Sequence, residues 1–194
     1  MTGPPQIRTD RLLLRPWRDD DRAPFARINS DPAVMEYFPA LLSEAETHQL
    51  IDRIESHFAL HGFGLWAVET HEHSQFIGYI GLAVPHFEAA FTPFEIGWRL
   101  ASSHWGRGLA FEGAQAVVRH AFLTLDLPEV VAFTVPANLR SRRVMEKLRM
   151  TYDPADDFDH PLVPEGHPLC RHVLYRLNRD AWVARDSGVS RALY

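Results

Sequence analysis

The sequence predicts an α/β domain with one mixed β-sheet of about seven strands flanked by about four helices. Three observations predict this class. Short runs rich in β-branched and aromatic residues alternate along the 194 residues with stretches in which apolar residues recur every three or four positions. Two strand-like runs are joined by the polar stretch HEHSQ, which is typical of a hairpin. The chain has no internal repeat and no interior linker, which favours a single domain.

The expected strands are short apolar runs bounded by polar or turn-forming residues. They cover 10–17, 63–70, 76–84, 94–101, 130–135, 150–153 and 171–177. The expected helices have one apolar face and start at residues that cap helices. They follow the acidic run 19–21 and cover 43–62, 108–124 and 138–148. The boundaries of the helix over 43–62 are the clearest, because Ser43 and Glu46 form a capping-box pattern and Gly62 ends it.

The bulk composition is that of an ordinary globular protein, with 46% hydrophobic and 23% charged residues. A net charge of −5 and an isoelectric point near 6.1 argue against a general nucleic-acid binder or a membrane-surface protein. The single cysteine, Cys170, rules out an internal disulfide and suits a reducing compartment. We therefore expect a cytoplasmic protein that binds neither nucleic acid nor membrane.

A glycine-containing loop precedes the helix over 108–124 and indicates an anion site. Exposed N–H groups and the helix dipole favour an anion at a helix start, and Gly106 and Gly108 let a bulky phosphate come close. Arg107 lies in the loop and can add a charge-assisted contact. The loop lacks the Gly-Lys-Ser/Thr of nucleotide-hydrolysing enzymes, and Phe111 stands where a dinucleotide motif needs its third glycine. The alternative is a tight turn without a ligand.

A second helix start carries a concentration of positive charge. The segment NLRSRRVMEKLRM begins with Asn138, a natural N-cap, and its cations are Arg140, Arg142, Arg143 and Lys147. In an acidic protein, such a cluster suggests a polyanionic ligand, and two helix starts suit one with several phosphates, such as coenzyme A. The alternative is a solvated basic face that pairs with the carboxylates Asp153, Asp156 and Asp157.

Three other reactive side chains lack the surroundings that a site requires. His71 and His73 lie in a predicted turn without a third ligand, so we expect no metal site. Cys170 lies in a polar loop without an obvious histidine partner, which argues against a nucleophile.

Five segments stand in a recognisable order along the chain: TDRLLLRPW, IGYIGL, EIGWRL, HWGRGLAFEG and NLRSRRVMEKLRM. As an ordered set they resemble the GCN5-related N-acetyltransferases (GNAT), and within them the RimJ/RimL-type branch. The resemblance covers residues 7–178 as one domain and leaves 179–194 as a C-terminal tail. Gly108 and Ala110 match the family's loop pattern, whereas Trp105 stands at its Gln/Arg position, a replacement typical of this branch.

The resemblance implies a mixed sheet whose fourth and fifth strands, 94–101 and 130–135, run parallel and splay apart around the arm of acetyl-CoA. Acetyl-CoA would be the cosubstrate, and no metal would be needed. The residues implied to bind it are Leu100, Trp105, Gly106, Arg107, Gly108, Leu109, Ala110, Asn138, Arg140 and Arg143. Leu100 would hold the arm through its main chain, the loop would hold the pyrophosphate, and the arginines would reach the 3′-phosphate.

The implied reaction is direct transfer of an acetyl group to an amine. It requires a base for the amine and a proton donor for the departing thiolate. Met145 replaces the tyrosine that many members use as the donor, so Ser141 is the candidate, with a capping or packing serine as its alternative. Glu95 is the candidate base, with a solvated strand carboxylate as its alternative; His86 and His104 are weaker candidates.

The acceptor is a primary amine of a class that the sequence leaves open: a protein N-terminus, a polyamine, an amino sugar or an amino-acid-like metabolite. The acidic loop over 153–168, with Asp157 and Asp159, is expected to edge the acceptor site and to favour a cationic amine. Two other functions compete with the enzyme: a non-catalytic acyl-CoA sensor and a scaffold of the same fold. The oligomeric state also stays open, with a homodimer among the states allowed.

Overall fold

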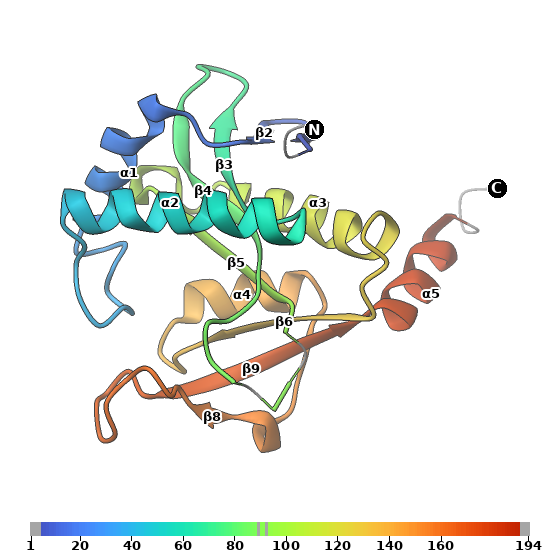
Figure 1. Cartoon of the computed structure of the whole chain (residues 1–194). Helices are drawn as coiled ribbons and strands as arrows, with labels where there is room; N and C mark the ends of the chain where they lie inside the picture. The colour runs from blue at the N-terminus through green and yellow to red at the C-terminus, as the bar shows by residue number, and fades with distance from the viewer. Residues whose placement is uncertain (1–4, 89, 92, 191–194) are drawn as a thin grey trace.

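The computed structural model describes residues 5–88, 90–91 and 93–190, and their strands form one mixed sheet (Figure 1). The strands are β1 (Ile7–Arg8), β2 (Leu12–Arg15), β3 (Leu65–Thr70), β4 (Phe76–Ala83), β5 (Glu95–Leu100), β6 (Glu129–Thr134), β7 (Thr151–Tyr152), β8 (Phe158–Asp159) and β9 (Arg171–Asn178). The sheet order is β1-β2-β3-β4-β5-β6-β9-β7, and β8 also pairs with β9. β5 and β6 are parallel, whereas the other pairs are antiparallel, so the predicted mixed α/β class is confirmed.

Five α-helices accompany the sheet in the described part of the chain. They are α1 (Arg22–Asn29), α2 (Glu44–His61), α3 (Leu109–Leu123), α4 (Leu139–Lys147) and α5 (Arg179–Ser190). The capping box that the sequence predicts for α2 is present, because the Ser43 hydroxyl accepts from the Glu46 N–H while the Glu46 carboxylate accepts from the Ser43 N–H. None of these described helices combines the length and the apolar character needed to cross a bilayer.

The stretch that the sequence predicts as a tail forms α5 as far as Ser190. Its start is capped, because the Asn178 Oδ1 accepts from the Asp180 N–H at 2.9 Å. The Trp182 ring packs against Phe122 of α3 with the ring centroids 5.5 Å apart. One aromatic side chain therefore attaches the C-terminal helix to the domain, although the sequence around it shows no clear helical period.

The register of the central strands assigns their side chains to two faces, because directly paired residues project to the same side. Glu95 pairs with Val131 of β6, which pairs with Arg176 of β9; we call this side the Glu95 face. Ile80 projects to the opposite side and meets Gly113 of α3, so we call that side the α3 face. Glu95 and the start of α3 therefore lie on opposite sides of the sheet.

The parallel strands β5 and β6 share one register pair, Glu95 with Val131, and then diverge. The Val131 N–H donates to the Phe94 carbonyl at 2.9 Å at this point. No further pair joins the two strands along their described length, and Figure 1 shows them at an angle to each other. The predicted opening between the two parallel strands is present.

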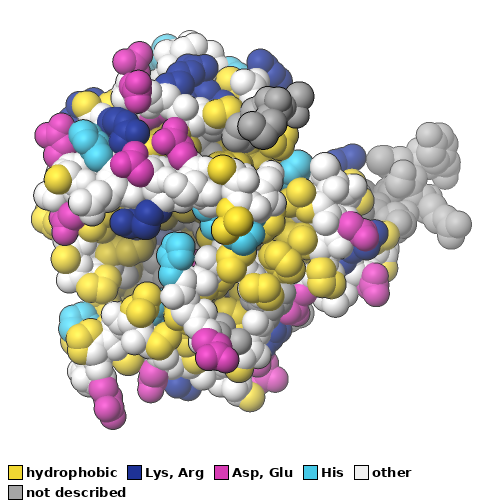
Figure 2. Space-filling model, in the orientation of Figure 1, with side chains coloured by type: hydrophobic (Ala, Val, Ile, Leu, Met, Phe, Trp, Pro, Cys, Tyr) yellow, Lys and Arg dark blue, Asp and Glu magenta, His cyan; other side chains and the backbone are white. Residues whose placement is uncertain are grey.

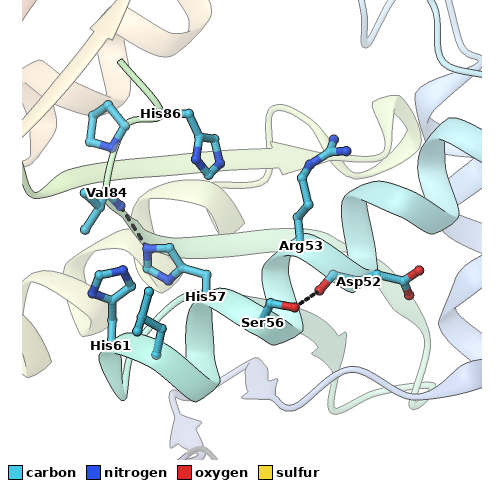
Figure 3. Close-up of a pocket in the computed structure, with 9 residues that line it drawn as sticks. Asp52, Arg53, Ser56, His57, His61, Val84 and His86 are labelled. Atoms are coloured by element: carbon cyan, nitrogen blue, oxygen red, sulfur yellow. Dashed lines mark hydrogen bonds between the residues drawn. The ribbon is translucent and has the colours of Figure 1, made fainter. Parts of the chain in front are cut away.

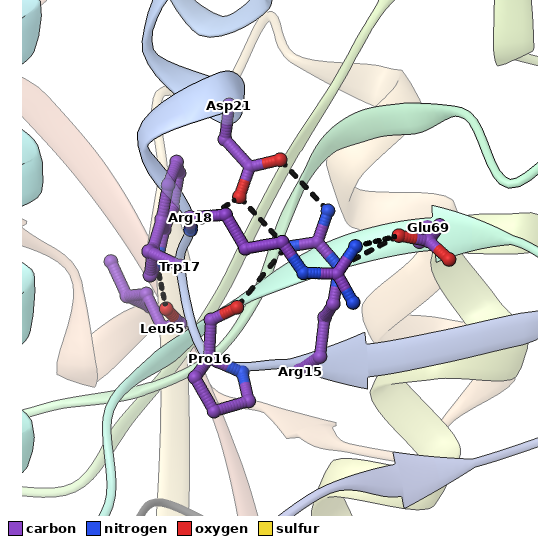
Figure 4. Close-up of polar contacts among 7 residues, drawn as sticks. All are labelled: Arg15, Pro16, Trp17, Arg18, Asp21, Leu65 and Glu69. Atoms are coloured by element: carbon purple, nitrogen blue, oxygen red, sulfur yellow. Dashed lines mark hydrogen bonds and ion pairs between the residues drawn. The ribbon is translucent and has the colours of Figure 1, made fainter.

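A buried arginine fixes the edge of the sheet near α1 (Figure 4). Two nitrogens of Arg15 donate to the two oxygens of Asp21 at 2.7 and 2.8 Å, and its Nε donates to Glu69 at 2.8 Å. The Arg15 side chain is 3% exposed, so its charge is compensated where water cannot reach it. This is the ordinary arrangement of a buried guanidinium, with an anion beside each donor edge.

Candidate functional site

The loop before α3 has the backbone that an anion site needs. Gly106 and Gly108 have φ angles of +73° and +79°, a region in which an L side chain would be strained. The first main-chain N–H of this helix that bonds to the protein is that of Glu112, which donates to the Gly108 carbonyl. The three N–H groups before it, at Leu109, Ala110 and Phe111, have no protein acceptor among the described residues.

Space is open at this loop. A side chain built on Gly106 would meet nothing within 4 Å, and one on Gly108 would meet only the tip of Arg11, at 3.6 Å. The unbonded N–H groups and the positive end of the helix dipole therefore lie beside a region that a phosphate could enter.

The loop is held to the first hairpin by a carboxylate that sequence reasoning did not single out. Glu112 accepts from the Thr9 hydroxyl at 2.6 Å and from Nε of Arg11 at 2.6 Å, while Nη1 of Arg11 donates to the Arg107 carbonyl at 2.9 Å. Burial raises the pKa of Glu112, but these hydrogen bonds outweigh it, so the net pKa is lowered and the group stays ionised. In the sequence, the segment TDR (residues 9–11) supplies both partners of Glu112 and could have indicated this contact.

Trp105 joins the loop to β5 and to α4. Its indole N–H donates to the Leu100 carbonyl at 2.9 Å, and the Arg140 guanidinium lies over its ring at 4.5 Å. Arg140 is also paired with Glu36 at 2.6 Å, a contact that the sequence did not predict. The two helix starts with candidate phosphate-binding groups are therefore brought together.

The main chain of β5 faces the opening toward β6. The Ala101 N–H donates to Ile77 on the β4 side, so the alternate residues Leu100 and Trp98 direct their main-chain groups to the opposite side. The register gives these two residues no partner on β6. Trp105 already occupies the Leu100 carbonyl, which leaves the Leu100 N–H for a ligand.

The start of α4 is organised by Asn138. Its Oδ1 accepts from the Ser141 N–H at 3.1 Å, and its Nδ2 donates to the Thr134 hydroxyl at 3.0 Å. Ser141 is half-buried, and its capping contact uses the main-chain N–H rather than the hydroxyl. Arg143 is exposed on the same helix.

The structure does not pair the basic face of α4 with the acidic loop, which was the alternative to a ligand site. Asp156 is bonded to Arg176 at 2.6 Å, and Asp153 accepts from the Ala155 N–H. Asp157 accepts from the Tyr152 hydroxyl at 3.1 Å. The three carboxylates expected to neutralise α4 are engaged within their own segment, with β7 or with β9.

Glu95 lies at the single contact between β5 and β6. Its side chain is half-buried and forms no hydrogen bond or ion pair with the described residues. Burial raises the pKa of its carboxyl to about 8. Its Oε1 lies 3.9 Å from the position that a side chain on Gly97 would occupy, so the carboxylate lies beside the open strand surface above that glycine.

An aromatic and acidic cavity of about 380 Å³ lies on the Glu95 face. Its lining includes Phe87 and Phe91 from the β4–β5 connection, Asp157 from the acidic loop, and Leu174 and Arg176 from β9. One oxygen of Asp157, Oδ1, is buried and has no hydrogen-bond partner in the described chain. Asp159 also lines the cavity but is paired with Arg171 at 3.3 Å. The acidic loop and the aromatic side chains of the β4–β5 connection therefore line one cavity.

The histidines serve structure in a second hollow, of about 420 Å³, between α2 and the β4–β5 connection (Figures 2 and 3). His57 Nε2 accepts from the Val84 N–H at 3.0 Å, so its Nδ1 carries the proton donated to the Phe63 carbonyl at 2.9 Å. The pKa of His57 is lowered, and the largest cause of this shift is the burial of the ring. Since both ring nitrogens are used, the histidine is not free to ligate a metal; His86 lines the same hollow, away from the loop before α3.

His104, the other weaker candidate, lies beside the glycine loop rather than near Glu95. Its Nδ1 is 3.0 Å from the Ser103 hydroxyl. Burial, followed by the nearby Arg107 charge, lowers the pKa of this histidine. Its place therefore fits the phosphate end of a ligand better than the reacting end.

Comparison with known proteins identifies the family. A family model for an acetyltransferase (GNAT) domain matches residues 11–151. The chain belongs to the GNAT acetyltransferase family. Among its relatives, the YkkB protein of Bacillus subtilis is 32% identical over 153 residues, which cover 78% of this chain and 88% of YkkB.

Two further relatives agree with this assignment. The FsC-acetyl coenzyme A-N(2)-transacetylase of Aspergillus fumigatus is 31% identical over 191 residues, which cover 92% of this GNAT chain and 78% of that protein. The crystal structure of an acetyltransferase from Agrobacterium tumefaciens superposes with a TM-score of 0.73 at 29% identity, covering 92% of this chain and 96% of the other. Both matches span almost all of the GNAT chain.

Proposed function

We propose that this GNAT protein transfers an acetyl group from acetyl-CoA to a primary amine by direct attack of the amine. The observation that carries the proposal is the opening between β5 and β6 beside the unbonded N–H groups of α3. A diphosphate fits such a helix start, and an amide-containing arm fits the unpaired main chain of Leu100. The name of the relative from Aspergillus fumigatus, FsC-acetyl coenzyme A-N(2)-transacetylase, agrees with this cosubstrate.

The proposed binding residues act at successive parts of the cosubstrate. The pyrophosphate is bound by the loop residues Gly106, Arg107, Gly108, Leu109 and Ala110. The arm is bound by Leu100, and Trp105 positions the loop. Asn138 orients the start of α4, from which Arg140 and Arg143 reach toward the 3′-phosphate. Arg140 keeps part of its charge available, because its ion pair with Glu36 is exposed to water on both sides.

The reaction chemistry is assigned to two side chains. Glu95 removes a proton from the attacking amine, directly or through a water, and its raised pKa suits a base that works near neutral pH.

Ser141 donates a proton toward the departing thiolate from the first turn of α4. Since capping uses its N–H, Ser141→Ala should lower kcat about tenfold or more while leaving the KM for acetyl-CoA unchanged; an unchanged kcat would reassign the serine to packing.

The division of the sheet into two faces supports this assignment. The phosphate-binding loop belongs to the α3 face, and Glu95 belongs to the other. A ligand bound at the loop and passing through the opening would present its reactive end beside Glu95, while the acceptor would approach from the Glu95 face. Trp105 at the Gln/Arg position favours the RimJ/RimL-type branch within the family.

Two measurements separate this proposal from its competitors. Release of the CoA thiol is followed with a panel of amines, and acetyl-CoA binding is followed by calorimetric titration. The enzyme requires both binding and amine-dependent release. Binding without release with any amine would favour the acyl-CoA sensor, and the absence of binding would leave a scaffold of the same fold.

A further inference from the structure

A second buried arginine, Arg99, differs from the fully paired Arg15 of Figure 4. Arg99 is 8% exposed, and it forms no ion pair with the described residues. Its side-chain hydrogen bond with the described residues runs from Nη1 to the neutral Asn29 Oδ1, at 2.7 Å. A buried cation without an anion is costly, so its retention requires a reason.

The free edge of Arg99 is the one that binds planar anions. Phe38 covers the guanidinium at 4.1 Å from its ring centroid, and Tyr79 lies at 5.4 Å. The Nη1 corner is bonded to Asn29, whereas Nε is buried without a partner and Nη2 has no hydrogen bond to the described residues. The Nε and Nη2 hydrogens point in the same direction and form the fork that accepts two oxygens of a carboxylate.

Arg99 lies on the Glu95 face, along the same strand as the proposed base. Glu95, Gly97 and Arg99 alternate on β5, so all three project to one side. Glu95 and Arg99 are four residues apart, which corresponds to about 13 Å between their Cα atoms in a strand. Gly97 contributes no side chain between them, and a side chain built there would meet only the Glu95 carboxylate within 4 Å.

We propose that Arg99 binds a carboxylate of the amine that is acetylated, which makes the acceptor an amino-acid-like molecule rather than a polyamine. This inference rests on the proposed function, since it assigns the acceptor of that reaction. The fork of Arg99 fixes the carboxylate, and the open floor at Gly97 lets the rest of the acceptor extend toward Glu95. An amine without an anionic group would leave the guanidinium unpaired and would bind more weakly.

The test compares amino acids with their carboxamides, which keep the amine and remove the negative charge. CoA release is measured for both members of each pair with the wild type and with Arg99→Gln. In the wild type, we expect kcat/KM to favour the acid at least about tenfold, mainly through KM. In Arg99→Gln that ratio should fall to near one, because the acid loses affinity and the carboxamide does not. Comparing ratios cancels the different reactivities of the two amines.

Two control variants separate binding from structure. Arg99→Lys keeps the charge but not the fork, so it should retain part of the preference. Phe38→Leu keeps the guanidinium and removes its aromatic cover, so it should change both substrates equally. If Arg99→Gln also lowers both equally, or if the wild type shows no preference for acids, the inference is overturned.

The outcome stays separate from that of the proposed function. If no amine releases CoA, the proposed function fails, and calorimetric titration of the CoA-bound wild type with the acid and the carboxamide then tests Arg99 directly. If Arg99→Gln does not fold, the wild-type ratio and the partial loss in Arg99→Lys decide. Acetylation of polyamines with an efficiency equal to that of amino acids would contradict the assignment.

Discussion

At the scale of single residues, Glu95 shows how burial without a partner raises the pKa of a carboxyl group. An ordinary glutamate is ionised far below neutral pH, but burial raises the pKa of this one to about 8. At pH 7 most molecules therefore carry it protonated, and the fraction able to accept a proton increases with pH. Arg15 shows the opposite case, in which both carboxylates beside the charge keep it stable and unreactive.

This difference predicts the pH dependence of Glu95→Gln. In the wild type, kcat/KM should rise as the pH passes through about 8 with the slope of one proton. Glu95→Gln should be about a hundredfold slower and lose that rise, while its KM for acetyl-CoA stays unchanged. Initial rates between pH 6 and pH 9 with saturating cosubstrate check this. A variant with the wild-type pH profile would remove Glu95 from the role of base.

The same pKa has a consequence for stability. Because the folded pKa exceeds the unfolded value, ionisation of Glu95 disfavours the folded state. The stability that the protonated Glu95 carboxyl contributes is fully present below the pKa of the unfolded state. It is lost as the pH rises through the folded-state pKa of about 8. The free energy of unfolding should therefore decrease less between pH 5 and pH 9 in Glu95→Gln than in the wild type, measured by urea denaturation.

At the scale of elements, the sequence predicts what local patterns encode. The spacing of apolar residues locates α2, α3 and the main strands, and alternation places Glu95 and Arg99 on the same side of β5. It does not reveal that Arg99 is buried, because that depends on Phe38 and Asn29, which come from elsewhere in the chain. The bonds from Arg11 to Glu112 and from Arg140 to Glu36 likewise join residues about a hundred positions apart.

The parts of the candidate site can be located from the sequence to a similar depth. The loop, the start of α4 and the two parallel strands follow from short motifs and from the family resemblance. The role of Trp105 as the link between them does not, because its bond to Leu100 and its contact with Arg140 arise only after the strands and helices have packed. Such tertiary contacts have no counterpart in the hydrophobic pattern.

The loop before α3 offers a prediction with an internal control. Gly108→Ala places a side chain at a φ of +79°, and Gly166→Ala does the same at +80° in an exposed loop away from the start of α3. Each should lose about 1 kcal/mol of stability from backbone strain. Only Gly108→Ala should weaken acetyl-CoA binding, by at least about tenfold, because it also alters the approach to the helix start.

Calorimetric titration with acetyl-CoA, together with thermal unfolding, separates these two effects. Equal dissociation constants for Gly108→Ala and Gly166→Ala would show that the loop does not bind the cosubstrate. A loss of binding in both variants would instead point to a general effect of stability.

At the scale of the whole molecule, the charges of the Glu95 face are arranged around the proposed reaction centre. Arg99 lies along β5 from Glu95, and the cavity with the acidic loop lies over β6 and β9. Of the two loop carboxylates that the sequence singles out, Asp159 is paired with Arg171, whereas the Oδ1 of Asp157 has no partner. An acceptor with both a carboxylate and a positive charge would therefore match the two ends of this face.

The two aspartates give the final prediction. Asp157→Asn should raise the KM for a cationic amine about tenfold, because it removes the negative charge of a carboxylate whose Oδ1 has no partner among the described residues. Asp159→Asn should change this KM by less than about threefold, since the lost charge is exposed and already paired with Arg171. Neither variant should change the KM for acetyl-CoA, because the cosubstrate is proposed to bind from the other side of the sheet. Steady-state kinetics at two salt concentrations check the assignment, because a charge effect weakens with salt whereas a change in cavity shape does not. Equal KM values for the amine in the wild type and Asp157→Asn would remove the acidic loop from the acceptor site.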